Sequence, residues 1–363
     1  RRVPPPSPPR HMSPKGRKTS KTSWSFDVPS PRAPKPASAN PVNQFSSAAA
    51  PPAPEETKAV RFSGVKLAKQ LKVELGGKLE KFTKEFQGLK PKLTILQVGN
   101  RSDSTGYVNK KRDAAMAIGM ECDLVQLPEE STQQDLLDAM EACNTDPSIH
   151  GIIVQQPLPK HIDVATIESA IDYKKDVDAL HPINVGLLAS HKFEQLGPMK
   201  GQVVPCTAEA VCRIIDSLDF DLEGKKAVVL GCSNIVGGPT AQLLRHRKAT
   251  VTSCHKWTSD IKNITRTADV LVVAMGQMEK VDASWIKPGA VVIDVGIHYK
   301  ELEDGSVKCV GDTVQESIKQ VAGVYTPVPG GVGPLTVAGV LTNTMRCANN
   351  LATEQAAKQT IAA

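Results

Sequence analysis

From about residue 59 onward the chain repeats one pattern, in which short apolar runs alternate with amphipathic stretches. The runs carry apolar residues at successive positions, which is typical of strands buried on both faces. Such strands, separated by helices, form parallel sheets that the helices cover, and 363 residues suffice for two domains. The sequence therefore predicts a two-domain α/β protein. The expected strands are "KLTILQVG" (92–99), "GIIVQQP" (151–157), "KKAVVLG" (225–231), "ATVTSCH" (249–255), "DVLVVAMG" (269–276) and "AVVIDVG" (290–296).

The first 54 residues have a different composition. They contain 14 of the 27 prolines and nine basic residues against one acid, a net charge of +8. Such a segment cannot bury enough apolar surface to offset the entropy of ordering it. We expect residues 1–58 to be a disordered linker or a transit-like extension. The transit interpretation indicates an organelle, a mitochondrion in preference to a plastid, with the cytoplasm as the alternative.

The rest of the chain excludes several classes of protein. The whole chain carries +6, so the remainder carries −2, and nothing argues for nucleic acid. No apolar run is long enough to span a membrane. The eight cysteines include no C-x-x-C pair, which supports neither a metal site nor a disulfide framework. We expect reduced and mostly buried thiols.

A glycine-rich turn, "GCSNIVGGP" (231–239), lies between an expected strand and the helical stretch "TAQLLRH". Turns of this kind present backbone N–H groups and a helix N-terminus to nucleotide phosphates, although many tight turns contain glycines for steric reasons alone. At the end of the next strand, dinucleotide folds usually carry an acid for the ribose of NAD. Here His255 and Lys256 stand there, which favours the 2′-phosphate of NADP, although Lys256 could equally be solvated.

The stretch "STGYVNKKRDAAMAIG" (104–119) predicts a helix with Asp103 or Ser104 as its N-cap and Gly119 as its stop. Tyr107 and Lys111 are four residues apart, so they share one face. A lysine is most often a solvated charge, but one desolvated in a cleft can act as a base.

Two further polar positions are candidates. Gln155 lies at the carboxyl end of an expected strand, where α/β sheets bind ligands. Asp176 and Asp178 lie in "KKDVDAL" (174–180), which is otherwise a helix cap or a solvated turn.

The segment "YTPVPGGVGPLT" (325–336) has two prolines flanking three glycines, ahead of the expected helix "VAGVLTNTMRCANN". With "STGYVNKK", "GIIVQQPLP", "KDVDA", "PCTAEA", "GCSNIVGGP" and "ATVTSCH", it closely resembles the bifunctional methylenetetrahydrofolate dehydrogenase/methenyltetrahydrofolate cyclohydrolase family. The resemblance covers about residues 60–350.

The resemblance implies a fold and a reaction. It implies a catalytic folate-binding domain over 59–200 completed by 335–355, a Rossmann-type NAD(P)-binding domain over 201–334, and a tail over 356–363. The implied reaction oxidises methylenetetrahydrofolate with NADP, NAD being possible, and hydrolyses the methenyl product to formyltetrahydrofolate. A homodimer is implied, and residues 1–58 could dock the chain into a larger organellar assembly.

The resemblance also implies roles for residues. Lys111 would be the cyclohydrolase base, Tyr107 would pack against the folate, Gln155 would hydrogen-bond Lys111 and help hold it unprotonated, and Asp178 would anchor the pterin. Gly331, Val332, Gly333 and Pro334 would line the folate and nicotinamide cleft. The implied cofactor-binding residues are Gly231, Cys232, Ser233, Val236, Gly237, His255, Lys256, Ala274, Gly276 and Ile297.

Departures from the family pattern concentrate on the cofactor side. Cys232 stands where the family usually has arginine and Lys256 where it has serine, and both positions help hold the 2′-phosphate. Ala208, Ala210 and Met278 replace proline, glycine and proline, and Ala179 replaces the glycine after the pterin aspartate. Alanine would strain any turn that needed positive φ. Two alternatives to the bifunctional enzyme follow: a structural subunit of a large complex, and an enzyme with cyclohydrolase activity only.

Overall fold

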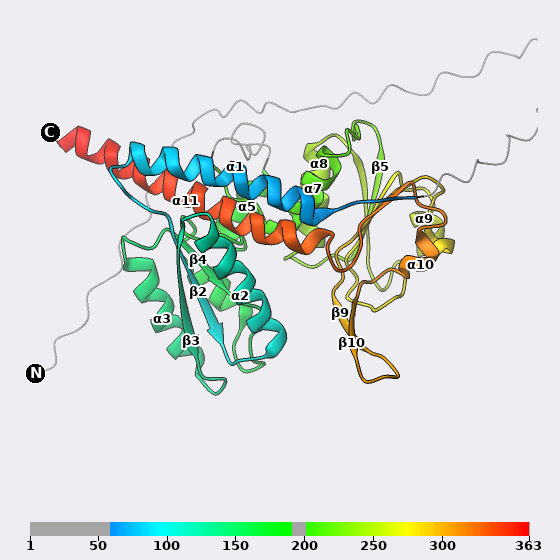
Figure 1. Cartoon of the computed structure of the whole chain (residues 1–363), viewed down its shortest axis with the longest axis horizontal. Helices are drawn as coiled ribbons and strands as arrows, with labels where there is room; N and C mark the ends of the chain where they lie inside the picture. Colours follow the sequence, from blue (N-terminus) through cyan, green and yellow to red (C-terminus); the bar gives the residue numbers. More distant parts are fainter. Residues whose placement is uncertain (1–58, 191–200, 363) are drawn as a thin grey trace, which may run out of the picture. The chain divides into compact units, whose positions relative to one another are not determined.

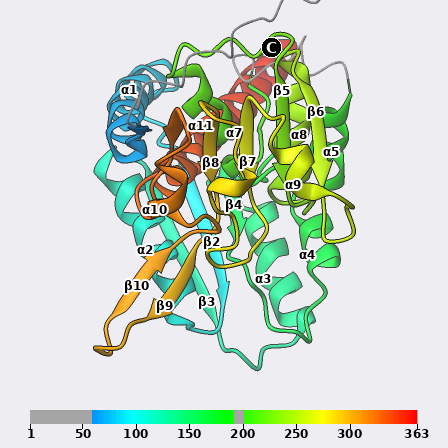
Figure 2. The same cartoon turned by 90° about the vertical axis from the view of Figure 1, so that its right-hand side faces the viewer.

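The structure is a computed structural model that describes residues 59–190 and 201–362. The expectations for residues 1–58 therefore lie outside the described residues. Two parallel sheets and one antiparallel hairpin make up the strands (Figures 1 and 2). The expected parallel α/β architecture is confirmed.

The smaller sheet has three parallel strands in the order β3-β2-β4. Its strands are β2 (Lys92–Val98), β3 (Glu121–Leu127) and β4 (Gly151–Val154). The helices of this half of the chain are α1 (Gly64–Glu85), α2 (Ser102–Ala117), α3 (Gln133–Thr145), α4 (Val164–Ala170) and α5 (Pro182–Ala189).

The larger sheet has six parallel strands in the order β1-β11-β8-β7-β5-β6. Its strands are β1 (Val60–Arg61), β5 (Lys226–Leu230), β6 (Thr250–Cys254), β7 (Val270–Val273), β8 (Val291–Asp294) and β11 (Val324–Tyr325). The remaining elements are α7 (Cys206–Asp216), α8 (Gly237–His246), α9 (Ile261–Thr265), the 3-10 turn η2 (Ala283–Trp285), the hairpin β9 (His298–Glu301) and β10 (Val307–Val310), α10 (Gln315–Ile318) and α11 (Val332–Ala362).

The strand order of the larger sheet reverses at β5, because β6 lies on one side of it and β7 on the other (Figure 2). Ligands of open α/β sheets bind at the carboxyl ends of the strands beside such a reversal. The fold therefore directs attention to the loops that follow β5, β6 and β7.

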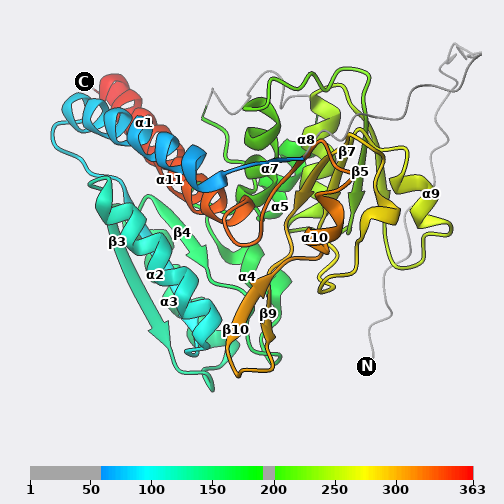
Figure 3. The same ribbon diagram turned by 45° about the vertical axis from the view of Figure 1, so that its right-hand side comes forward.

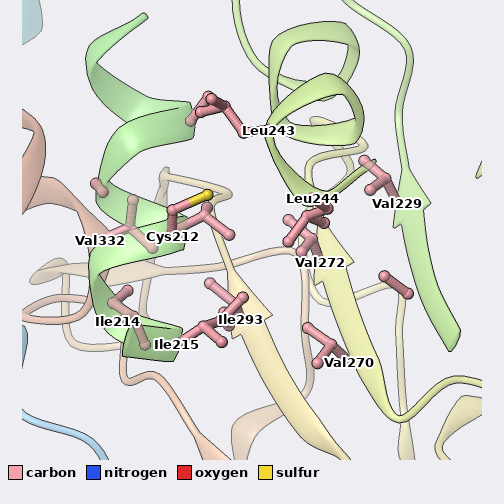
Figure 4. Close-up of a cluster of buried hydrophobic side chains, with 14 of the residues drawn as sticks. Cys212, Ile214, Ile215, Val229, Leu243, Leu244, Val270, Val272, Ile293 and Val332 are labelled. Atoms are coloured by element: carbon pink, nitrogen blue, oxygen red, sulfur yellow. The ribbon is translucent and has the colours of Figure 1, made fainter. Parts of the chain in front are cut away.

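One face of the larger sheet packs on α7 and α8 through a continuous apolar core. Figure 4 shows Ile214 and Ile215 of α7 and Leu244 of α8 close to Val272 and Ile293 of the sheet. All five side chains are buried. A core of this kind fixes where each strand ends, and hence where the loops of the site begin.

The long helix α11 connects the two halves of the molecule. It lies along α1 (Figures 1 and 3) and also contacts α2 and α7. Its Arg346 donates to the carboxylate of Glu209 on α7 at 2.9 Å, and Arg213 donates to the same carboxylate at 2.7 Å. These two guanidinium groups hold the pKa of the buried Glu209 carboxyl below its usual range, against the effect of burial.

Several boundaries differ from the expectations. The helix expected from 104 begins at Ser102, with Arg101 rather than Asp103 or Ser104 as its N-cap, because the Thr105 N–H already bonds to the Arg101 carbonyl. Strand β4 ends at Val154, since its pairing with β2 ends there. The last helix begins at Val332, five residues earlier than expected, because proline fits the first turn of a helix.

Within the described ranges, no helix is both long and apolar enough to cross a membrane. All eight cysteines are free, and five of them are buried. The expectation that most of the thiols are buried therefore agrees with the structure.

Candidate active site

Lys111 and Gln155 lie in contact, although 44 positions separate them in the chain. The Lys111 Nζ donates to the Gln155 Oε1 at 3.0 Å, and the lysine is only 8% exposed. The Gln155 Nε2 donates to the Gln156 carbonyl at 2.6 Å, so the side-chain oxygen is the atom that faces the amine. The ordinary interpretation of this lysine, a solvated surface charge, is therefore wrong.

Asp178 belongs to the same cluster. Burial raises the pKa of this half-buried carboxyl, while the positive charge of Lys111 and a hydrogen bond with Cys206 lower it. The Cys206 Sγ also lies 3.3 Å from the Val177 carbonyl, and burial raises the pKa of its thiol well above the usual value. An amine, an amide, a carboxyl and a thiol thus converge from α2, the end of β4, a turn and the start of α7.

The residue after Asp178, Ala179, replaces the glycine that is usual in the family, and its backbone conformation shows the effect. Ala179 is 1% exposed and has a φ of 58°, a region that alanine adopts only at a cost. The strain expected from replacing a glycine therefore falls on this turn. By contrast, Ala208 and Ala210 lie within helix α7 and do not have positive φ.

The neighbouring Asp176 is buried, unlike a residue of a solvated loop. Its Oδ2 accepts from the His181 N–H at 2.8 Å and from the Asn184 Nδ2 at 2.9 Å. His181 is the N-cap of α5. Asp176 therefore supports the start of α5, whereas Asp178 belongs to the cluster around Lys111.

A cavity of about 660 Å³ is lined by other residues of helix α2, among them Tyr107 and Lys110. The expected cleft residues Gly331, Val332, Gly333 and Pro334 all line it, together with Tyr107 and Ile297. Lys111, Gln155 and Asp178 are not among its lining residues. Burial raises the pKa of Tyr107 to about 12, and Tyr299 and Cys309 of the β9–β10 hairpin contribute to the shift. The cavity therefore brings α2 together with loops of the larger sheet.

The loop after β5 has the shape of a phosphate cradle. Gly231 has a φ of 108°, and a Cβ there would lie 2.0 Å from the Ala274 carbonyl oxygen. A Cβ on Gly237, the first residue of α8, would lie 2.0 Å from the Gly231 carbonyl oxygen. The segment 232–235 is exposed, and Val236, the N-cap, donates its N–H to Ser233 Oγ at 3.2 Å. A backbone pressed this closely together beside a helix N-terminus fits the pyrophosphate of a dinucleotide.

The loop after β7 is anchored by Asp312, which the sequence did not indicate. Its carboxylate accepts backbone N–H groups from Met275 at 2.6 Å, Gly276 at 3.0 Å and Gln277 at 2.8 Å. The His298 Nε2 lies 2.7 Å from the same carboxylate. A fully buried carboxylate thus fixes the segment 275–277, which contains the expected cofactor residue Gly276 and directly follows Ala274.

Asp294, another buried carboxyl, should make stability depend on pH. Burial raises its pKa from 3.8 to about 6. The folded-state pKa lies above the unfolded value, so its favourable contribution is complete below pH 3.8 and is lost as the pH rises through 6. The loss is roughly 3 kcal/mol. We expect the free energy of unfolding of wild type, minus that of Asp294→Asn, to fall by about this amount between pH 4 and 7 in urea titrations. A difference independent of pH would contradict the assignment.

Sequence comparison identifies the family. Residues 62–178 match the description "Tetrahydrofolate dehydrogenase/cyclohydrolase, catalytic domain", and residues 205–352 match "Tetrahydrofolate dehydrogenase/cyclohydrolase, NAD(P)-binding domain". The chain belongs to the tetrahydrofolate dehydrogenase/cyclohydrolase family. The cavity, the Lys111 cluster and the glycine cradle are therefore features of a family member.

Individual family members are similar over most of their length. The chain is 43% identical to the Bifunctional protein FolD of Listeria innocua over 288 residues, which cover 79% of this chain and 96% of that protein. It is 41% identical to the Bifunctional protein FolD 4, chloroplastic, of Arabidopsis thaliana over 297 residues, covering 81% and 80%. Relatives also include proteins named as mitochondrial and as cytoplasmic.

A solved structure of the family is similar in fold. The Trypanosoma brucei methylenetetrahydrofolate dehydrogenase-cyclohydrolase (FolD), solved with NADP cofactor and inhibitor, superposes with a TM-score of 0.75 at 39% identity. The superposition covers 81% of this chain and 98% of that one. The two-domain α/β fold expected from the sequence is confirmed.

The expected site residues thus fall into three groups in the structure. Lys111, Gln155 and Asp178 form the buried cluster, while Tyr107, Ile297 and the segment 331–334 line the cavity. The remaining expected residues lie on the loops after β5, β6 and β7 or, for Gly237, at the start of α8: Gly231, Cys232, Ser233, Val236, Gly237, His255, Lys256, Ala274 and Gly276. Cys206 was missed as a site residue, although its motif "PCTAEA" was a signal.

Proposed function

We propose that this chain oxidises 5,10-methylenetetrahydrofolate with NADP and hydrolyses the methenyl product to 10-formyltetrahydrofolate. The observation that carries the proposal is the buried contact between Lys111 and Gln155, in a chain of this family. Lysine side chains are rarely buried in folded proteins, and buried titratable groups cluster at functional sites.

The hydrolytic step uses that amine. Water adds to the one-carbon bridge of the methenyl cation, and the Lys111 Nζ, which has to be a neutral amine at this step, takes a proton from the adduct. The bond from the bridge carbon to N5 then breaks, N5 receives a proton, and the carbon remains on N10 as a formyl group. One proton is released overall. Gln155 accepts a hydrogen bond from Nζ and holds it at one position throughout.

Asp178 and Tyr107 are proposed to position the folate. The pterin presents an amino group and ring N–H groups, which a carboxylate accepts. Tyr107 lines the cavity and offers an apolar ring face to the substrate. Gly331, Val332, Gly333 and Pro334 complete the same wall, and the small glycines allow close approach of the substrate.

The oxidative step needs orientation more than acid–base groups. When bound, NADP accepts the hydride that leaves the one-carbon bridge. Gly231 and Gly237 would allow the pyrophosphate to approach the backbone of this loop closely, and Asp312 holds the loop that contains Gly276. The Ile297 side chain, 39% exposed in the cavity wall, contributes an apolar surface where cofactor and folate meet.

We assign the domains and the assembly on the same basis. Residues 59–200 with 335–355 are assigned to the folate domain and residues 201–334 to the nucleotide domain, except that strand β1 pairs with β11 in the larger sheet. A homodimer in a mitochondrion is proposed, with residues 1–58 as a targeting or docking extension. The family's typical dimeric state and the basic, proline-rich composition of that segment support these assignments.

A coupled assay tests the function. With methylenetetrahydrofolate and NADP, we expect reduced nucleotide and formyltetrahydrofolate to appear together. Hydrolysis of supplied methenyltetrahydrofolate without nucleotide reduction would instead support a cyclohydrolase-only enzyme, for which the changed loop at Cys232 is the motivating observation. No turnover of either kind, together with recovery of the chain in a large complex, would support a structural subunit.

A further inference from the structure

The hairpin of β9 and β10 contacts two different parts of the proposed site. The two strands form a sheet of their own that projects from the larger sheet (Figure 1). A two-stranded hairpin by itself is only marginally stable in water. The position of this hairpin therefore depends on what each of its faces contacts.

One face of the hairpin lines the cavity. Tyr299 of β9 and Cys309 of β10 are paired across the hairpin, and both line the cavity, as does Ile297 just before β9. Tyr299 is 51% exposed. A ligand that fills the cavity would cover this face, and by binding to the docked hairpin it would stabilise that arrangement.

The other face of β9 contacts the loop after β7 and its anchor. Neighbouring side chains of a strand point to opposite sides, so His298 and Lys300 lie on the face away from Tyr299. The His298 Nε2 lies 2.7 Å from the Asp312 Oδ1, and the Lys300 Nζ donates to the Glu279 Oε2 at 2.6 Å. One strand thus contacts the cavity on one side and the cofactor loop on the other.

Asp312 connects His298 to the backbone of that loop. Its Oδ1 also accepts the Gln277 N–H at 2.8 Å, so the histidine and the loop share one oxygen. The carboxylate has little room to move by itself, because the side chain is fully buried and a Cβ on Gly296 would lie 2.5 Å from its Cγ. A shift of β9 would therefore displace the loop as well.

His298 is the stronger of the two links. Its partner Asp312 is fully buried, and hydrogen bonds to charged groups away from water are the stronger ones. The Lys300 side chain is 45% exposed and the Glu279 side chain 31% exposed. Ion pairs that are open to water contribute little. The connection between the two faces therefore depends mainly on His298.

We propose that His298 is a positioning residue for the oxidation step, which holds the loop after β7 to the strand that lines the folate cavity. Through this link, a folate in the cavity and a nucleotide at the loop strengthen each other's binding. The effect is reciprocal, because coupling between two sites changes both affinities by the same factor. The inference rests on the proposed function, since its ligands are those of that reaction.

Calorimetry on the full chain measures this coupling without turnover. The folate used is tetrahydrofolate, which carries no one-carbon group to oxidise. In wild type we expect saturating tetrahydrofolate to increase the affinity for NADP about tenfold, and NADP to increase the affinity for tetrahydrofolate by the same factor. His298→Ala should reduce this factor to about two or less. His298→Gln should keep most of it, because its amide nitrogen can donate to the Asp312 carboxylate in place of Nε2.

Lys308→Gln is the matched control on the same hairpin. Lys308 of β10 pairs with Lys300, is exposed and is not among the residues that line the cavity, so this variant should show the wild-type coupling. Loss of coupling in Lys308→Gln, or full coupling in His298→Ala, would overturn the inference. So would weaker binding of each ligand alone to His298→Ala with an unchanged coupling factor, the result expected of a merely structural residue.

Hydrogen exchange of the wild type is a second measurement that needs no variant. NADP alone should slow amide exchange in β9 and β10, and tetrahydrofolate alone should slow it in the segment 275–277. Unchanged exchange in 275–277 with tetrahydrofolate bound would overturn the inference while turnover in the coupled assay persisted. A wild type that binds neither ligand and turns over no folate would overturn the proposed function as well.

Discussion

Lys111→Ala should reduce the rate of methenyltetrahydrofolate hydrolysis by about 10²- to 10⁴-fold, the usual contribution of a positioned acid–base group. NADP reduction should persist, because that step needs the two reacting carbons to be oriented rather than a proton to be transferred. The methenyl intermediate should therefore accumulate in a coupled assay, which separates the two activities in one experiment.

A conservative variant sharpens this test. Lys111→Arg keeps a positive charge in the buried site but cannot give up its proton near neutral pH. We expect it to be almost as defective in hydrolysis as Lys111→Ala. Near-normal hydrolysis by Lys111→Arg would mean that Lys111 supplies charge only, and the proton-transfer role would have to be abandoned.

Gly231→Ala should abolish NADP binding and nucleotide reduction while hydrolysis of supplied methenyltetrahydrofolate continues. The added Cβ would lie 2.0 Å from the Ala274 carbonyl oxygen, at a φ of 108°. Strained backbone of this kind costs about 1–3 kcal/mol, and the clash between two backbone segments adds to it. Isothermal titration with NADP and urea unfolding would measure the two consequences.

Gly224→Ala is the matched control for the cost of placing alanine at a positive φ. Gly224 also has positive φ, 73°, but a Cβ there would meet nothing within 4 Å. It should lose about 1 kcal/mol of stability and bind NADP normally. If Gly231→Ala behaved like Gly224→Ala, the cradle would not need the close approach seen between the loops after β5 and β7.

The sequence predicted the parts of the fold that local patterns encode. Runs such as "KKAVVLG" and "DVLVVAMG" are apolar at successive positions, and they became the buried strands β5 and β7. Strand β3 (Glu121–Leu127) was not anticipated. It lies at the edge of its sheet, and its sequence "ECDLVQL" mixes polar with apolar residues. Edge strands of this kind lack the continuous apolar signal.

The candidate site was predictable only in part, for a similar reason. Tyr107 and Lys111 were expected to share a helix face, but Tyr107 lines the cavity and Lys111 does not. The link between Lys111 and Gln155 joins elements far apart in the chain, and only the family resemblance suggested it. The anchoring of the loop at Gly276 by Asp312 had no signal, because a buried aspartate looks like a surface aspartate in a single sequence.

The placement of the first and last described elements, β1 and α11, bears on how this protein can be divided. Strand β1 (Val60–Arg61) joins the larger sheet before the chain forms the smaller one, and α11 returns at the end to pack along α1. No single cut therefore yields two contiguous fragments that each keep all their native neighbours. Separately expressed halves should be insoluble or unfolded. A split or circularly permuted form should fold only when β1 stays with the larger sheet and α11 stays with α1.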